Sequence, residues 1–219
     1  MKKTLIAVAL AAVAFGTSAQ TSTLQRETDS PTFGVKAQWN LNSPTTSYNE
    51  PVSVYTNGSG FSAGAFYTIP LYRGLYVEPE LSVFYNTVII DTDFMQALFT
   101  DEKVPPQGSL RNVGLRIPVT VGWRFNLTDN MALSLFTGPQ LNVGLMLNRY
   151  VNTTKRNINL YDQGWRRLDA QWTFGARFYY ADNWMAEITG GVGMTDLLGK
   201  SIPGNFRRNT FAVGVGYIF

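Results

Sequence analysis

The 219-residue chain has 45% hydrophobic, 14% aromatic and 15% charged residues, a formal net charge of +3, and neither histidine nor cysteine. These missing residue types exclude Ser-His-Asp and Cys-His catalysis, thiol redox chemistry and the usual zinc sites, so we expect no enzyme, cofactor or metal. Low charge and abundant Tyr, Phe and Gly favour a β-rich protein.

The first 19 residues have the pattern of a cleaved secretory signal peptide. Lys2 and Lys3 precede an apolar run from Leu5 to Phe15, and small residues follow as far as Ala19. The run is shorter than the roughly 18 residues that a helical membrane span needs. Removing residues 1–19 takes away two lysines and no acid, so the net charge falls from +3 to +1 and gives no support to nucleic-acid binding. Residues 20–31 are polar and predict a short periplasmic lead.

Eight segments between residues 32 and 219 alternate apolar and other side chains at the period of two that a strand requires. We expect strands at about 33–41, 61–69, 75–85, 113–125, 131–145, 170–180, 184–194 and 209–219. Long connections follow the odd-numbered strands and short turns follow the even-numbered ones. An even strand count with this asymmetry is typical of outer-membrane barrels, with the short turns and both chain ends in the periplasm. The pattern predicts an all-β fold, an eight-stranded antiparallel up-and-down transmembrane β-barrel.

Alternation alone does not say which face meets lipid, and a secreted barrel with an apolar calyx is the competing interpretation. Two features favour the membrane. The polar face carries few charges for a solvated exterior, and aromatic residues gather at the two ends of the apolar face, as bilayer interfaces select. We expect an outer belt that contains Trp39, Tyr85 and Trp172, and a periplasmic belt that contains Trp123, Phe125, Tyr180, Trp184 and Tyr217.

Charges on the inward face nearly balance. They are Lys36, Arg116, Arg124 and Arg177 against Glu78, Glu80, Asp169 and Glu187. A three-residue turn at 181–183 would place Arg177 opposite Glu187. Eight strands leave a lumen that side chains can fill, so we expect ion pairs across it. Glu78 and Glu80 could suggest a catalytic carboxylate pair, but an ion-pair network with Arg116 and Arg124 is the favoured interpretation. A narrow polar solute path is the alternative to a plugged lumen.

The long loops are the other candidate functional regions. The third carries Arg149, Lys155, Arg156, Arg166 and Arg167, and the fourth adds Lys200, Arg207 and Arg208. Binding of lipopolysaccharide phosphates and ordinary solvated charge both remain open for these cations. The second loop is apolar at Val88–Ile90 and at residues 94–99, which favours strand extension or a cap over the mouth, with a sticky contact surface as a third option.

The last strand, N-T-F-A-V-G-V-G-Y-I-F, ends on Phe219 and resembles the C-terminal strand of small Gram-negative outer-membrane barrels. With the runs at 60–66, 74–82, 116–121 and 138–140, the chain resembles the porin-family "outer membrane protein beta-barrel domain" and the small OmpA/OmpX-type barrels. The resemblance implies the outer membrane of a Gram-negative bacterium, contact with outer-membrane lipid, and Phe219 as the signal read by the barrel-assembly machinery. It implies a non-enzymatic barrel, monomeric by expectation, with a structural or surface-interaction role through its loops. A narrow porin-like channel or transporter for small or apolar solutes is the alternative.

Overall fold

The computed structural model describes residues 30–47, 55–90, 108–151, 157–181, 183–199 and 204–219. Among these residues, no helix reaches the length and apolarity of a membrane span. The elements are β1 (Thr32–Ser47), β2 (Tyr55–Thr56), β3 (Gly58–Tyr72), β4 (Leu75–Ile90), β5 (Gly108–Thr128), β6 (Met131–Val151), β7 (Asn157–Asn159), the 3₁₀ helix η1 (Leu160–Gln163), β8 (Leu168–Tyr180), β9 (Trp184–Gly193) and β10 (Asn205–Ile218).

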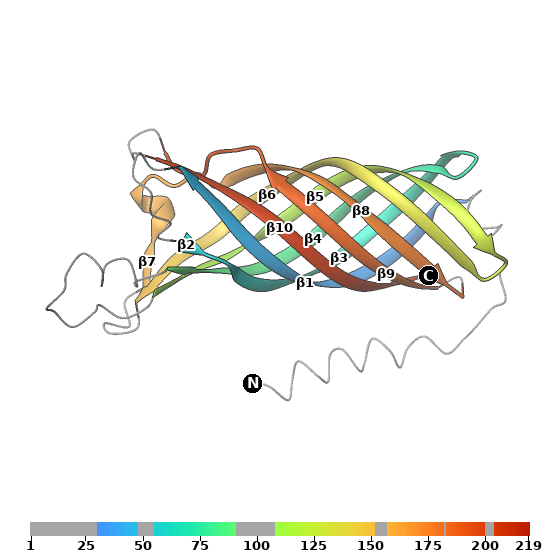
Figure 1. The fold of residues 1–219 in the computed structure, drawn as a ribbon, viewed down its shortest axis with the longest axis horizontal. Helices are drawn as coiled ribbons and strands as arrows, with labels where there is room; N and C mark the ends of the chain where they lie inside the picture. The colour runs from blue at the N-terminus through green and yellow to red at the C-terminus, as the bar shows by residue number, and fades with distance from the viewer. Residues whose placement is uncertain (1–29, 48–54, 91–107, 152–156, 182, 200–203) are drawn as a thin grey trace, which may run out of the picture.

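Eight long strands close into a ring in which every neighbour is antiparallel (Figure 1). β1 pairs with both β3 and β10, and pairing of β4 with β5 completes the circle, so no long strand has a free edge. β2 and β7 are short additions on β4 and β6. The predicted eight-stranded up-and-down topology is confirmed. The turns β3–β4, β5–β6 and β8–β9 lie at the same end of the barrel as the C-terminus, and β7 and η1 lie at the other, which we call the outer end.

The alternation in sequence becomes an alternation in exposure. On β10, Phe211, Val213 and Val215 are exposed, whereas Ala212 between the first two is buried. Val215 is 60% exposed, and Leu81 and Val83 on β4 are 56% and 54% exposed. Large apolar side chains therefore cover the outside, while the inside holds glycine and polar residues. This is the arrangement that a hydrocarbon surround stabilises.

The strands run further at the outer end than the apolar alternation indicates. β1 continues to Ser47 through a Pro/Ser/Thr/Asn stretch that was predicted to be loop, because β10 pairs with it as far as Ser47–Asn205. Val88–Ile90 extend β4, as predicted, while residues 94–99 lie outside the described residues. β10 begins at Asn205, so the prediction that Arg207 and Arg208 lie in a loop is wrong. Polar residues form strand here because a neighbouring strand supplies their backbone partners.

A β-bulge changes the face of β6 near the outer end. Val113 pairs with Met146 and Gly114 pairs with Gly144, which leaves Leu145 as the extra residue. Leu145 and Met146 are consequently both exposed, and Leu147 turns inward. The outer end of the lumen is thereby apolar, with a cluster made of Val88, Ile90, Leu110, Leu147 and Leu160.

Candidate functional site: the filled lumen and the capped outer end

The eight inward charges named from the sequence all lie on strands with buried side chains, none more than 9% exposed. Arg177 on β8 is the centre of the cluster that they form. Its guanidinium makes two bonds of 2.7 Å to the carboxylate of Glu78 on β4 and contacts of 2.5 and 2.8 Å to Oε2 of Glu187 on β9. Arg177 stands directly opposite Glu187 in the β8–β9 register. One side chain therefore joins two walls of the barrel across its interior.

Lys36 on β1 adds a second cation to this cluster. Its Nζ lies 2.7 Å from Glu80 and 2.9 Å from Glu187. Gln38 donates to Glu187 at 2.6 Å, and Thr68 donates to Glu78 at 2.7 Å. Buried charged groups need several ion-pair and hydrogen-bond partners, because burying a charge without a partner costs free energy. The central cluster thus ties β1, β3, β4, β8 and β9 together.

Glu78 and Glu80 form ion pairs with Arg177 and Lys36, in addition to lying on the strand next to Arg116 and Arg124. Arg116 on β5 donates to the amide oxygens of Asn142, Gln38 and Asn40 and to the Ser62 hydroxyl, over 3.3 to 3.5 Å. Arg124 lies over the rings of Tyr179 and Tyr76, at 4.0 and 6.0 Å from their centroids. Arg177 and Lys36 reach the two carboxylates from other strands, because side chains in an eight-stranded barrel meet across the lumen as readily as along the wall.

A second ion pair lies nearer the outer end. Arg208 on β10 contacts Oδ2 of Asp169 at 2.6 Å, and Asn142 and Gln171 donate to the same oxygen. Sequence reasoning named Asp169 but placed Arg208 in a loop. The signal was present, since the alternation of β10 continues backwards through the inward positions Ala212, Thr210 and Arg208. That continuation is not evident from an apolar pattern, because polar residues occupy it.

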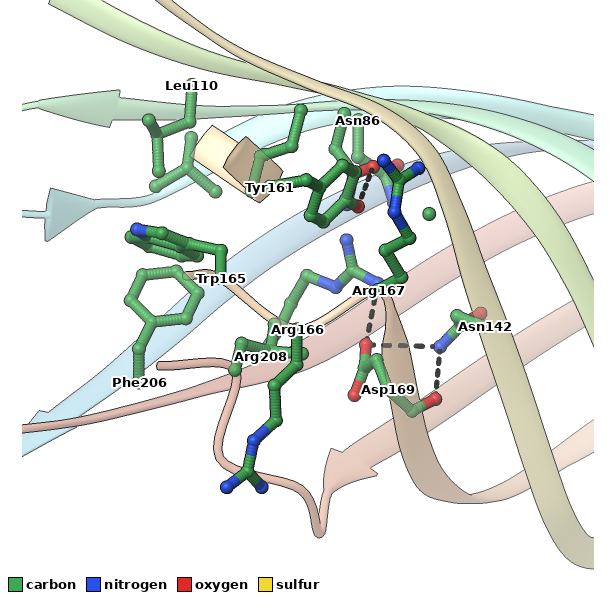
Figure 2. Close-up of a pocket in the computed structure, with 15 residues that line it drawn as sticks. Asn86, Leu110, Asn142, Tyr161, Trp165, Arg166, Arg167, Asp169, Phe206 and Arg208 are labelled. Atoms are coloured by element: carbon green, nitrogen blue, oxygen red, sulfur yellow. Dashed lines mark hydrogen bonds and ion pairs between the residues drawn. The ribbon is translucent and has the colours of Figure 1, made fainter. Parts of the chain in front are cut away.

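Above this pair, residues from β4, β5, β6, β8, β10 and the η1 segment surround a cavity of about 30 Å3, the outer pocket (Figure 2). The Tyr161 ring lies against Gly144, whose missing side chain leaves room for the phenol hydroxyl. Arg167 stacks on that ring at 4.5 Å, and the hydroxyl donates to Asn112 at 3.5 Å. Burial raises the pKa of Tyr161 above its ordinary value. Gly164, with a φ of 95°, ends η1 in the left-handed conformation that favours glycine.

An apolar cap closes the outer end over this pocket. We define the cap as residues 160–167 with Leu197, Leu198 and Phe206. Trp165 lies 5.2 Å from the Phe206 ring, and Tyr55 of β2 lies 5.1 Å from it. Leu160 joins the apolar cluster at the outer end of the lumen, and Arg166 donates its N–H to the Leu197 carbonyl at 2.9 Å. The described residues therefore obstruct the lumen twice, with ion pairs in the half nearer the short turns and with side-chain packing at the outer end.

The exterior carries aromatic residues at both ends. Trp123, Phe125, Tyr180 and Trp184 are 44% to 52% exposed on the strand ends next to the short turns, where Tyr217 packs edge-on against Trp184. Trp39 and Trp172 are similarly exposed towards the outer end, and Tyr85 packs beside Phe61. Beyond them Arg111, which sequence reasoning missed, lies over Tyr150 at 4.2 Å.

Exposed cations surround the outer end. They are Arg111, Arg149, Arg166, Arg167 and Arg207. Lys155, Arg156 and Lys200 lie outside the described residues. The described part of the chain contains no group of three or more His, Cys, Asp or Glu residues that could hold a metal ion.

A closed barrel with an apolar exterior and a polar, filled interior defines an integral membrane barrel of the outer-membrane class. The family model described as "Outer membrane protein beta-barrel domain" matches residues 14–199, and the chain belongs to this family. The family implies the outer membrane of Gram-negative bacteria. No curated protein matches the chain.

Three solved barrels are similar in fold. Ail of Yersinia pestis, solved with the heparin analogue sucrose octasulfate, is 10% identical with a TM-score of 0.43, over 86% of this chain and 99% of Ail. Neisserial surface protein A is 12% identical with a TM-score of 0.46, over 85% and 97% of the two chains. OprG of Pseudomonas aeruginosa is 9% identical with a TM-score of 0.48, over 87% and 97%.

Proposed function

We propose that this protein is a non-enzymatic outer-membrane barrel that does not conduct solutes and acts through its outer end, in a structural or surface-interaction role. The observation that carries the proposal is the double closure of the lumen. Arg177 bridges Glu78 and Glu187 in the half of the barrel nearer the short turns, and the cap packs over the outer end. A solute would have to break buried ion pairs, each of which is expensive to separate.

The exposed outer end is the proposed contact surface. Arg111, Arg149, Arg166, Arg167 and Arg207 present guanidinium groups there. Guanidinium groups bind phosphate with paired hydrogen bonds, so lipopolysaccharide phosphates are the proposed lipid partner. Arg111 lies over the Tyr150 ring, and a cation beside an interfacial aromatic residue would meet lipid headgroups there.

The remaining proposals concern export and assembly. Residues 1–19 would direct export and be cleaved, with residues 20–31 as the periplasmic lead. Phe219 is 70% exposed, stacks on Phe33 and packs edge-on against Tyr217. An exposed terminal aromatic on the last strand supports its role as the contact for the barrel-assembly machinery. The oligomeric state is proposed to be a monomer.

Potassium efflux from vesicles separates a plugged barrel from the alternative, a narrow channel or transporter. The folded protein and the Arg177→Ala variant are reconstituted at equal density, with folding checked by heat-modifiable gel mobility. A plugged barrel predicts no efflux from either protein, since other side chains still fill the lumen. Efflux that rises in the variant would favour a gated path.

Lipopolysaccharide binding is measured on the same preparations. The intact protein should bind lipopolysaccharide micelles more tightly than the double variant Arg111→Gln, Arg207→Gln. Arg73→Gln at the opposite end is the matched control, because Arg73 is an exposed arginine in the β3–β4 turn. Equal binding by all three proteins would remove the basic contact surface from the proposal.

A further inference from the structure

The ladder of strand pairs is broken at mid-strand in three of the eight seams of the barrel. Pairing runs without a gap along β1–β3, β1–β10, β9–β10, β8–β9 and β6–β8. Each of the other three seams lacks two consecutive pairs, although the register is the same on both sides of the gap. The gaps lie between Phe66–Glu80 and Ile69–Val77 in β3–β4, between Pro79–Val119 and Ser82–Arg116 in β4–β5, and between Pro118–Gln140 and Val121–Thr137 in β5–β6.

Each gap contains one proline, at Pro79, Pro118 or Pro139. Proline has no N–H, so it cannot donate to the carbonyl on the opposite strand. Extending the register through each gap places these prolines opposite Tyr67, Glu80 and Val119 respectively. Three neighbouring seams therefore each lose a ladder bond. We call residues 67–68, 78–81, 117–120 and 138–139 the proline band.

The proline band lies in the part of the wall that faces the hydrocarbon. Leu81 and Val119 on its outer face are 56% and 42% exposed. In a sheet, proline is ordinarily confined to edge strands and bulges, and this ring has no long edge. Inside a bilayer, a backbone carbonyl without a donor is costly unless another group or water reaches it. Three aligned prolines at this depth therefore require a second source of hydrogen bonds.

The lumen offers such a source behind the Glu80–Pro118 pair, since both of these residues line a luminal cavity. A cavity of about 20 Å3 is lined by residues that include Glu78, Glu80, Pro118, Thr120 and Gln140. This volume accommodates a water molecule, and carboxylate, hydroxyl and amide groups provide the polar partners that a buried water needs. Next to the gap in β4–β5, the Thr120 hydroxyl donates to the Glu78 carbonyl at 3.4 Å, so a side chain supplements the intact Glu78–Thr120 ladder pair there.

We propose that this luminal cavity is a water-binding site that completes the hydrogen bonding of the proline band, and that the band is the sector of the wall that opens first. Water from the lumen donates to carbonyls that proline leaves without a ladder bond. Hydrogen bonds to water exchange more readily than hydrogen bonds between strands. The three seams therefore separate more readily than the five continuous ones. The barrel wall is therefore hydrated, and opens more easily, at the three seams between β3 and β6 and not at the other five.

Cysteine accessibility tests the proposal cleanly, because the natural chain has no cysteine. Val119→Cys places a thiol on the lipid-facing side of the band. Val213→Cys on β10 is the matched control, since each valine lies four residues from an aromatic residue near the short-turn end, Trp123 and Tyr217, and both are exposed to similar extents. In nanodiscs, a water-soluble methanethiosulfonate reagent should modify the thiol of the Val119→Cys variant at least tenfold faster than that of the Val213→Cys variant. Equal rates would overturn the proposal.

Restoring the missing donor provides the second arm of the experiment. Pro118→Ala returns an N–H opposite Glu80, and Pro139→Ala returns one opposite Val119. In the Val119→Cys background, either substitution should slow modification severalfold and slow hydrogen exchange of residues 117–121. Two independent substitutions are used, so that the test can still be made if one of the variants does not fold. If folded variants leave both rates unchanged, proline is not the cause and the proposal fails.

Discussion

Replacing Arg177 is the most informative perturbation of the lumen. The Arg177 guanidinium is 1% exposed and bonds to both Glu78 and Glu187, which are themselves 2% exposed. Arg177→Ala removes the shared cation and leaves the Glu78 carboxylate with only the Thr68 hydroxyl among the bonds described above. Removing one partner of a buried ion pair typically costs about 3–5 kcal/mol, and we expect a loss in this range in the free energy of unfolding.

The assay is urea unfolding of the refolded protein in vesicles, followed by tryptophan fluorescence. A double-mutant cycle isolates the pair: Arg177→Met, Glu78→Gln and both together. The double variant should lose about 2 kcal/mol less than the sum of the single variants, because it no longer buries an unmatched charge. Arg207→Ala, at an exposed position on β10, should change stability by less than about 0.5 kcal/mol. Strict additivity in the cycle, or a loss below about 1 kcal/mol for Arg177→Ala, would refute the account of the network.

Three further predictions concern the outer end. Asp169→Asn should destabilise the barrel by about 3 kcal/mol in the same unfolding assay, because it leaves the buried Arg208 without its carboxylate, whereas Asp162→Asn at an exposed site should have little effect. Gly144→Ala should displace the cap, because the added methyl group overlaps the Tyr161 hydroxyl; trypsin cleavage after Arg166 and Arg167 should then accelerate, and unchanged cleavage would contradict that packing. Because burial raises the pKa of Tyr161, the folded state holds the proton more tightly than the unfolded state does, so docking of the cap should be complete below pH 10 and weaken as the pH rises through the folded pKa. Absorbance at 295 nm, compared between wild type and Tyr161→Phe, should show this tyrosine ionising above its ordinary pKa, and ionisation at the ordinary pKa would contradict the burial.

The strands were predictable where one face is apolar. Phe211, Val213 and Val215 define β10 by period alone, and the opposing register of Arg177 and Glu187 follows from one short turn. The strands could not be predicted where the residues on both faces of a strand are polar. Residues 44–47 and 205–208 were predicted to be loop although the two segments pair with each other, because the hydrogen bonds that hold them are backbone bonds that no side-chain pattern reports.

The cross-lumen partners were harder to predict than the positions of the charges. Sequence spacing gives the face of each residue but not which opposite wall it reaches. Arg116 lies on the strand next to Glu80, and yet Lys36 from β1 takes that carboxylate. The bulge at Leu145 was also invisible, because an inserted residue shifts the phase of an apolar run without changing its composition. The capped end depends on that shift, since it turns Leu147 inward.

Single-channel recording of the folded protein in planar bilayers tests the central claim most directly. A heat-modifiability gel on the same preparation establishes that the barrel is folded. The account predicts a silent membrane, because ion pairs and the cap close the lumen at two heights. Discrete and reproducible openings by the folded protein would contradict it, and would make Lys36, Glu78, Arg177 and Glu187 the lining of a conducting path.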